Sequence, residues 1–172
     1  MNLATHCAAN DSSPNAETGG TMRVARLREG DRDVARRLFT LMAEVFDEGC
    51  EPLGDAYLDR LLAREEFWAL AAFDGDELVG GLTAHTLPMT RSEAAEIFIF
   101  DIAVHVDHQR RGVGKRLVTM LREGAARAGI ETIFVPADND DEHALDFYRA
   151  LGGDAAPVTI FTFSSADDSP HA

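Results

Sequence analysis

The chain has 172 residues, 45% of them hydrophobic and 27% charged, a composition typical of one globular domain. Sixteen Lys and Arg against thirty Asp and Glu give a formal net charge of −14, which argues against nucleic acid or an anionic membrane as the main partner. No segment has the roughly 20 consecutive apolar residues of a membrane helix, and we read no signal peptide.

Cys7 and Cys50 lie far apart in the sequence, which suits neither a disulfide framework nor a metal site. We therefore expect a cytoplasmic protein. Residues 1–20 are small, polar and aperiodic and predict a disordered leader. We expect one folded domain over residues 21–164 and a polar tail over 165–172.

Hydrophobic periodicity and turn residues predict the elements of this domain. In chain order, we expect a strand at 22–27, a helix between Asp31 as N-cap and Gly49, a helix at 55–65, strands at 67–73 and 77–87 joined by Asp74-Gly75-Asp76, a strand at 96–106, a helix at 112–128, a strand at 132–136, a helix at 142–151 closed by Gly152-Gly153, and a last strand at 158–163. This order predicts a single mixed α/β (α+β) domain around one sheet.

A glycine-containing turn, residues 109–115, separates the strand at 96–106 from the next helix. The first N–H groups of a helix have no partner within it, and glycine lets a bound group approach the backbone closely. Arg110, Arg111, Lys115 and Arg116 make this turn basic in an acidic chain. The pattern therefore favours an anion site, the alternative being a glycine turn with solvated arginines. It matches neither the dinucleotide-binding fingerprint nor a Walker A loop.

The segment 109–114, Gln-Arg-Arg-Gly-Val-Gly, resembles the [Gln/Arg]-x-x-Gly-x-[Gly/Ala] signature of the GNAT superfamily of N-acetyltransferases. This resemblance implies a mixed, mostly antiparallel sheet flanked by helices and splayed at the site of the co-substrate, acetyl-CoA. The pyrophosphate would bind the turn, and the pantetheine would pair with the preceding strand end. The implied cofactor-binding residues are Ile102, Ala103, Val104, Gln109, Arg110, Arg111, Gly112, Val113, Gly114 and Lys115.

The segment 144–152 resembles the family's next signature, A-x-x-[Phe/Leu]-Tyr-x-x-Leu-Gly. There the tyrosine hydroxyl protonates the departing thiolate, so the resemblance implies that Tyr148 is the general acid. An unperturbed phenol, with a pKa of about 10, carries its proton at neutral pH. The alternative is that Tyr148, like Phe147, only anchors its helix to the sheet. Many relatives have Asn where this chain has Asp141, which puts the cofactor contact made by that Asn in doubt.

Asp101 interrupts the otherwise apolar run 97–104 immediately before the implied pantetheine-binding residues. A carboxylate there could attract a substrate ammonium and take its proton, whereas burying one without a partner costs several kcal/mol. The alternative is that Asp101 faces solvent. Other acids on the same strand and after the next strand predict an acidic rim for a polycationic substrate, the alternative being a solvated acidic loop. These residues are Glu93, Glu96, Asp138, Asp140, Asp141 and Glu142.

The segments 67–74, 78–82, 92–93 and 97–104 look like those of type I aminoglycoside 3-N-acetyltransferases, the gentamicin acetyltransferases. This resemblance implies acetylation of an aminoglycoside 3-amino group, with antibiotic resistance as the result, and implies that Asp101 binds the substrate amine. The alternatives are acetylation of a polyamine or protein amine, or a non-catalytic acyl-CoA-binding domain. Dimers are frequent in the resembling family, and the apolar segment 158–163 could support one. The histidines have no metal-ligand spacing, so we expect no metal.

Overall fold

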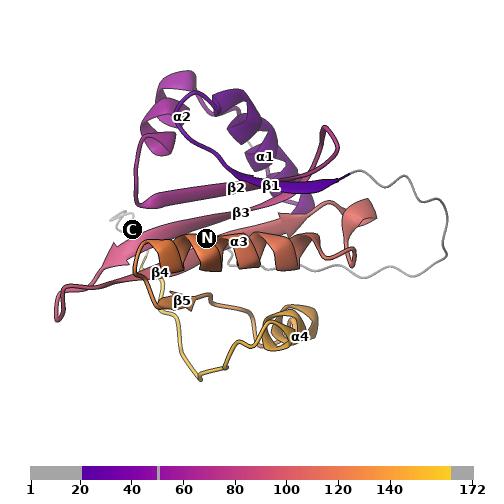
Figure 1. The fold of residues 1–172 in the computed structure, drawn as a ribbon. Helices are drawn as coiled ribbons and strands as arrows, with labels where there is room; N and C mark the ends of the chain where they lie inside the picture. The colour runs from indigo at the N-terminus through magenta and orange to yellow at the C-terminus, as the bar shows by residue number, and fades with distance from the viewer. Residues whose placement is uncertain (1–20, 50, 164–172) are drawn as a thin grey trace, which may run out of the picture.

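The computed structural model describes residues 21–49 and 51–163, which form one five-stranded sheet with helices on both faces (Figure 1). The predicted leader and tail lie outside the described residues. Within those ranges no helix is long and apolar enough to cross a membrane. The elements are β1 (Met22–Arg26), α1 (Arg32–Val45), α2 (Asp55–Leu62), β2 (Phe67–Asp74), β3 (Glu77–Pro88), β4 (Ala95–Val104), the 3-10 turn η1 (Val106–His108), α3 (Val113–Arg127), β5 (Thr132–Phe134) and α4 (Glu142–Ala150).

The strands lie in the order β1-β2-β3-β4-β5, and only the β4–β5 pair is parallel. This confirms the predicted mixed, mostly antiparallel sheet. The parallel pair is short, because Glu96–Phe98 pair with Thr132–Phe134 while β4 continues to Val104. No described residue of β5 pairs with residues 99–104, so the sheet is splayed along the second half of β4.

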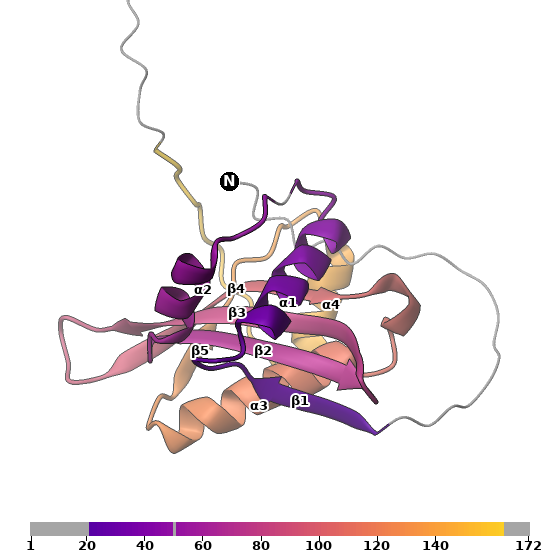
Figure 2. The ribbon, with the colours of Figure 1, turned by 90° about the horizontal axis from the view of Figure 1, so that it is seen from above.

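Each face of the sheet has its own hydrophobic cluster. Helices α1 and α2 cover one face, where Leu38 and Leu58 are completely buried (Figure 2). Helix α3 covers the opposite face through Leu117 and Leu121. We call these the α1 face and the α3 face. The cluster to which a residue of the sheet belongs therefore shows to which side it points.

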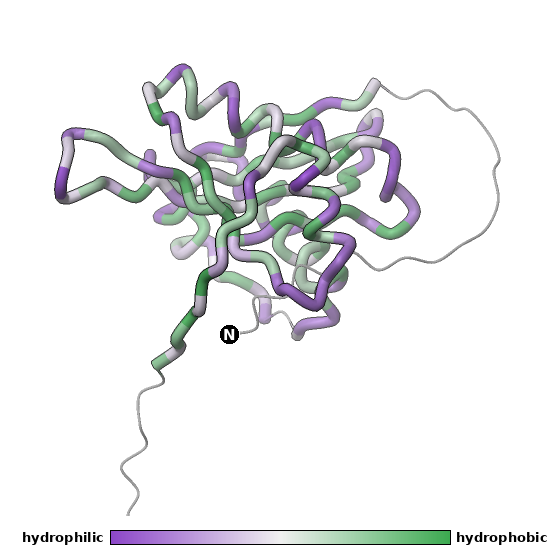
Figure 3. Tube along the Cα trace, turned by 90° about the horizontal axis from the view of Figure 1, so that it is seen from below, coloured by the Kyte–Doolittle hydropathy of each residue, from purple (hydrophilic) through white to green (hydrophobic). Residues whose placement is uncertain are grey.

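The predicted last strand, 158–163, is wrong, because the described chain continues there without regular secondary structure. Strand propensity reflects how well a side chain fits a pleated, half-buried surface, and this segment pairs with no described strand. It runs away from the body of the molecule (Figures 2 and 3). Its large apolar side chains are exposed: Val158 by 70%, Ile160 by 55%, Phe161 by 76% and Phe163 by 93%.

Candidate active site

The second half of β4 has a free edge, and this is where the sequence predicts an extended site for pantetheine. Backbone N–H and C=O groups on an unpaired strand edge can bind an added extended ligand as a further strand would. A side chain of the following turn fixes the last residue of this edge, because Gln109 Nε2 donates a hydrogen bond of 3.1 Å to the Val104 carbonyl. The first residue of the predicted turn therefore holds the strand end in place.

The turn itself has the backbone of an anion-binding loop. Arg110 and Gly112 both have positive φ, 58° and 83°, and α3 begins directly afterwards. A Cβ on Gly112 would meet no atom within 4 Å, so the space in front of this helix N-terminus is open. Arg110, Arg111 and Lys115 are exposed around it. The unpaired helix amides and these cations fit the pyrophosphate of acetyl-CoA.

The structure explains why residue 114 is a glycine, which the sequence did not indicate. A Cβ at this position would lie 3.1 Å from Cζ and 3.2 Å from Cε2 of Phe147. The Phe147 ring of α4 therefore packs against the first turn of α3. This contact joins the two signature segments and sets the position of Tyr148, the next residue of α4, relative to the phosphate turn.

A β-bulge determines the direction of Asp101. Thr83 pairs with Asp101 and Ala84 pairs with Ile99, so Phe100 is an extra residue in β4. Before the bulge, Ile97 and Ile99 point to the α3 face, and after it Ile102 and Val104 do so. The bulge thus changes which alternate residues face α3, and it places the neighbours Phe100 and Asp101 together on the α1 face.

The carboxylate of Asp101 is half-buried and accepts a hydrogen bond of 3.1 Å from Thr83 Oγ1. Burial raises the pKa of Asp101, the hydrogen bond from Thr83 opposes this, and the charge of Glu48 raises it further. A raised pKa brings a carboxyl group closer to the range in which it works as a base at neutral pH. Sequence reasoning did not identify Glu48, which places a second carboxylate close to Asp101.

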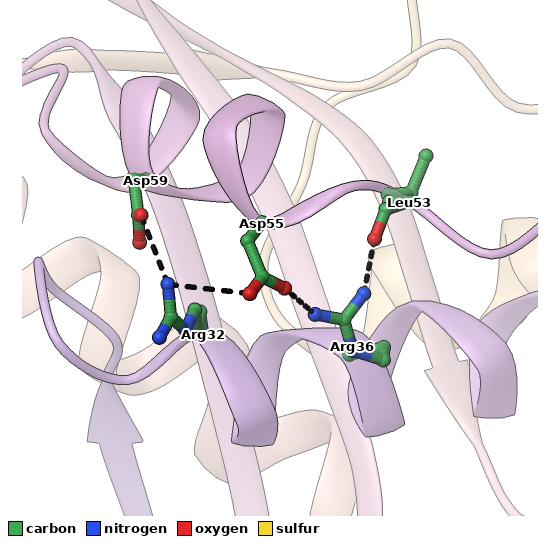
Figure 4. A network of polar contacts seen from close by, with 5 residues as sticks. All are labelled: Arg32, Arg36, Leu53, Asp55 and Asp59. Carbon is green, nitrogen blue, oxygen red and sulfur yellow. Dashed lines mark hydrogen bonds and ion pairs between the residues drawn. The ribbon is translucent and has the colours of Figure 1, made fainter.

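Glu48 lies in the connection between α1 and α2, and polar contacts hold these helices together (Figure 4). Arg36 binds the Leu53 carbonyl and the Asp55 carboxylate, while Arg32 lies 3.1 Å from Asp59 and 3.5 Å from Asp55. Exposed ion pairs stabilise a protein only slightly. Because four side chains and a carbonyl combine here, the network fixes the end of the connection and the start of α2 against the first half of α1.

The loop after β5 uses its acids partly for its own structure. Asp141 Oδ1 accepts a hydrogen bond of 3.0 Å from the Ala144 amide and so caps α4, and Asp138 Oδ1 accepts one from the Asp140 amide. Asp performs this capping as well as Asn does, which gives Asp141 a role that an Asn at this position would share. Glu142 is exposed in the first turn of α4, where a negative charge is favourable.

Glu93 and Glu96 lie at the opposite end of β4 from the phosphate turn. Glu96 is the second residue of the strand, five residues before Asp101, or about 16 Å in an extended chain. Glu93 precedes the strand. Since β4 and β5 are parallel, the loop 138–142 follows the end of β5 that points in the same direction as Val104. The prediction of one acidic rim is therefore wrong for Glu93 and Glu96.

Tyr148 is half-buried on α4, and its ring centroid lies 5.1 Å from that of Phe147. The fold thus places this phenol on the helix that packs against the phosphate turn. Within residues 21–49 and 51–163, no group of three or more His, Cys, Asp and Glu could hold a metal ion. The groups that the fold brings to this part of the molecule are carboxylates, a phenol and backbone amides.

A family model described as "Acetyltransferase (GNAT) family" matches residues 33–152, most of the folded domain. The chain belongs to this family. Its enzymes use acetyl-CoA, which agrees with the open turn and free strand edge described above. The predicted α/β fold is confirmed by the same match and by the sheet.

Comparison with known proteins illustrates the relationship. The chain is 36% identical over 95 residues to "Uncharacterized N-acetyltransferase YvbK" of Bacillus subtilis (strain 168), a match covering 55% of this chain and 57% of that protein, little more than half its length. The chain is also 35% identical in sequence to the aminoglycoside acetyltransferase HMB0005 from an uncultured soil metagenomic sample. The crystal structure of that protein is similar with a TM-score of 0.80, and the match covers 85% of this chain and 99% of that chain.

A second aminoglycoside acetyltransferase from an uncultured soil metagenomic sample, meta-AAC0020, was crystallised in complex with sisomicin. It is 31% identical, with a TM-score of 0.80 over 88% of this chain and 100% of that one. The fold is also similar to that of AAC(6')-Iy in complex with a CoA bisubstrate analogue, at 15% identity and a TM-score of 0.71.

Proposed function

We propose that this protein acetylates an amino group of an aminoglycoside with acetyl-CoA as donor, and that the 3-amino group is the acceptor. One observation carries the proposal: the bulge in β4 places the half-buried carboxylate of Asp101 on the α1 face, directly before the free strand edge. The two aminoglycoside acetyltransferases at 35% and 31% identity support the substrate class. The choice of the 3-amino group rests on the resemblance of segments 67–74 and 97–104 to the type I enzymes.

In this proposal acetyl-CoA supplies the thioester that is attacked. The turn 109–115 binds the pyrophosphate, and residues 102–104 hold the pantetheine in line with β4. Asp101, with Glu48 nearby, attracts the substrate ammonium and takes its proton, directly or through water, so that the neutral amine can attack. Backbone N–H groups of β4 polarise the thioester carbonyl while the C–N bond forms. Tyr148 donates a proton to the sulfur as the C–S bond breaks.

The loop acids Asp138, Asp140, Asp141 and Glu142 remain candidates for contacts with further substrate amines. A net charge of −14 favours a polycationic substrate by long-range attraction. Asp138 and Asp141 already accept backbone hydrogen bonds, so Asp140 and Glu142 have more freedom to bind such an amine.

The test measures release of the CoA thiol with gentamicin, sisomicin, kanamycin, spermidine and a basic peptide. We expect turnover of the aminoglycosides, with the acetyl group located on the 3-amino nitrogen by NMR of the product, and a raised inhibitory concentration of gentamicin for a susceptible cell that expresses the protein. Exclusive acetylation of spermidine or the peptide would overturn the substrate class. Acetylation at another amino group would overturn only the position.

Two variants test the assigned roles. Asp101→Asn should lower kcat/KM by about 10²- to 10⁴-fold, the usual contribution of a general acid or base, and Tyr148→Phe should lower kcat within the same range. Glu93→Gln is the matched control, because this carboxylate lies at the far end of β4, and its kinetics should not change. Full activity of Asp101→Asn would contradict the assigned role.

A further inference from the structure

Four aromatic side chains form a continuous row on the α1 face of the sheet, which we call the aromatic strip: His85, Phe98, Phe100 and Phe134. Ring centroids are 6.1 Å apart for His85 and Phe100, 6.0 Å for Phe98 and Phe100, and 5.4 Å for Phe98 and Phe134. The strip therefore crosses from β3 over β4 to β5.

The strip lies on the same side of the sheet as Asp101. Phe98 alternates with Ile97 and Ile99, both of which point to the α3 face, and the bulge places Phe100 beside Asp101. His85 contacts Phe67, a member of the cluster beneath α1 and α2. Phe100, an inner member of the aromatic strip, is thus the sequence neighbour of the proposed amine-binding carboxylate.

The described helices do not bury the strip. Phe98 and Phe100 are half-buried, and Phe134 is 41% exposed. Helix α1 packs over β2, β3 and the second half of β4, and α2 packs over β2, but neither cluster of buried residues includes Phe100 or Phe134. Phe98, Phe100 and Phe134 therefore form a group of neighbouring apolar side chains on two adjacent strands that is still accessible to solvent. Such a group marks a binding surface more often than a single exposed apolar residue does.

The charges around the strip select its ligand. Asp101 directly follows Phe100 of the strip and Glu48 lies near Asp101, so a bound group must combine an apolar face with a cationic amine. Aromatic faces carry partial negative charge and attract both C–H groups and cations. Burial, with a smaller effect of Arg64, lowers the pKa of His85, so its ring is uncharged at neutral pH and does not repel a cation.

We propose that the aromatic strip is a ring-binding subsite, on which an amino-sugar ring of the substrate lies over Phe98 and Phe134 while its reacting neighbour holds an amine at Asp101. This inference rests on the proposed function and adds to it the residues that distinguish a ringed polyamine from an acyclic one. The acids bind any polyamine, whereas the strip favours one built of rings.

The experiment compares Phe98→Leu and Phe134→Leu with the unchanged protein. Leucine keeps an apolar side chain and removes the aromatic face. Tyr57→Leu is the matched control, because it replaces an aromatic ring by leucine on α2, outside the strip, at a side chain that is 48% exposed. For each variant we would measure kcat/KM for gentamicin, the KM for acetyl-CoA and the melting temperature. For spermidine we would measure kcat/KM if it is a substrate, or the inhibition constant if it is a competitive inhibitor.

We expect kcat/KM for gentamicin to fall by about 3- to 10-fold in each strip variant, the usual range for one lost aromatic contact. The constants for spermidine and acetyl-CoA should stay within twofold, and Phe98→Trp should keep gentamicin activity. Equal losses for gentamicin and spermidine, or no loss for either, would overturn the subsite. So would a change in oligomeric state by light scattering, because the strip would then be an interface between copies. An unchanged protein that acetylates no aminoglycoside would instead overturn the proposed function.

Discussion

Gly114 offers a direct test of how the two signature segments are coupled. In Gly114→Ala the new methyl group would lie 3.1 and 3.2 Å from two ring atoms of Phe147, closer than ordinary van der Waals contact. The ring, and with it α4, must move by a few tenths of an ångström. Such overpacking costs about 1–3 kcal/mol. Replacing glycine by alanine inside a helix returns at most about 1 kcal/mol.

We therefore expect Gly114→Ala to lower the free energy of unfolding by about 1 kcal/mol, a loss of roughly 2–4 °C in melting temperature for a chain of this size. Phe147→Leu removes both ring atoms that the methyl group would meet. In the Phe147→Leu background the same change should be stabilising, because only the gain in helix propensity remains. The sign of the effect should thus reverse between the two backgrounds.

The assay is a double-mutant cycle of thermal and urea unfolding, with kcat measured for all four proteins. Since Tyr148 follows Phe147 directly, Gly114→Ala should also lower kcat severalfold by displacing the phenol. Lys115→Ala, a change on an exposed neighbour in the same helical turn, is the control for stability. An equal loss of stability in both backgrounds would refute the reasoning, because the strain would then lie in the turn and not at the ring.

Asp101→Asn should raise the melting temperature at pH 7. The pKa of Asp101 is raised in the folded state, so as pH rises the unfolded chain loses this proton before the folded protein does. The unchanged protein is therefore destabilised as pH rises from about 3.8 through the folded-state pKa, and the variant is not. A difference in melting temperature between the two proteins that stays constant down to pH 4 would contradict this. Asp141→Ala should cost about 1 kcal/mol by removing the cap of α4 while Asp141→Asn keeps the stability, and equal losses in urea unfolding would exclude capping. We expect the exposed apolar segment 158–163 to support a homodimer, so light scattering should give twice the monomer mass and Ile160→Lys with Phe161→Lys should give a monomer; an unchanged mass would exclude this segment.

Most elements of the fold were predictable because their side-chain periods are local. The apolar spacing of α1 and α3 and the continuous apolar run of β2 appear directly in the sequence. The cap by Asp141 could also have been predicted, since Asp directly before a helix is a common N-cap. Strand 158–163 was predicted wrongly because its residues favour a sheet without supplying a neighbouring strand.

The geometry around Asp101 was not predictable in the same way. Nothing in the sequence of residues 97–104 indicates a bulge. A single extra residue in a strand becomes visible only when its pairing with the partner strand is known. Glu48 approaches Asp101 through the packing of α1 on the sheet, which involves residues about fifty positions apart. The assignment of Glu93 and Glu96 to the rim overlooked strand direction, because residues that enter β4 lie at the opposite end from the loop that leaves its parallel neighbour β5.

The extra residue Phe100 also affects how such enzymes can be compared or redesigned. An alignment that treats β4 as a uniform ladder would match Asp101 with a core position of any relative that lacks the insertion, and would assign the acid to the wrong column. Deleting Phe100 would restore an unbroken ladder in which Asp101 directly follows Ile99, so the carboxylate would stay on the α1 face and would lose only its aromatic neighbour. Transplanting the adjacent pair of Phe100 and Asp101 onto one face of another scaffold therefore requires an added residue in the strand as well as two substitutions.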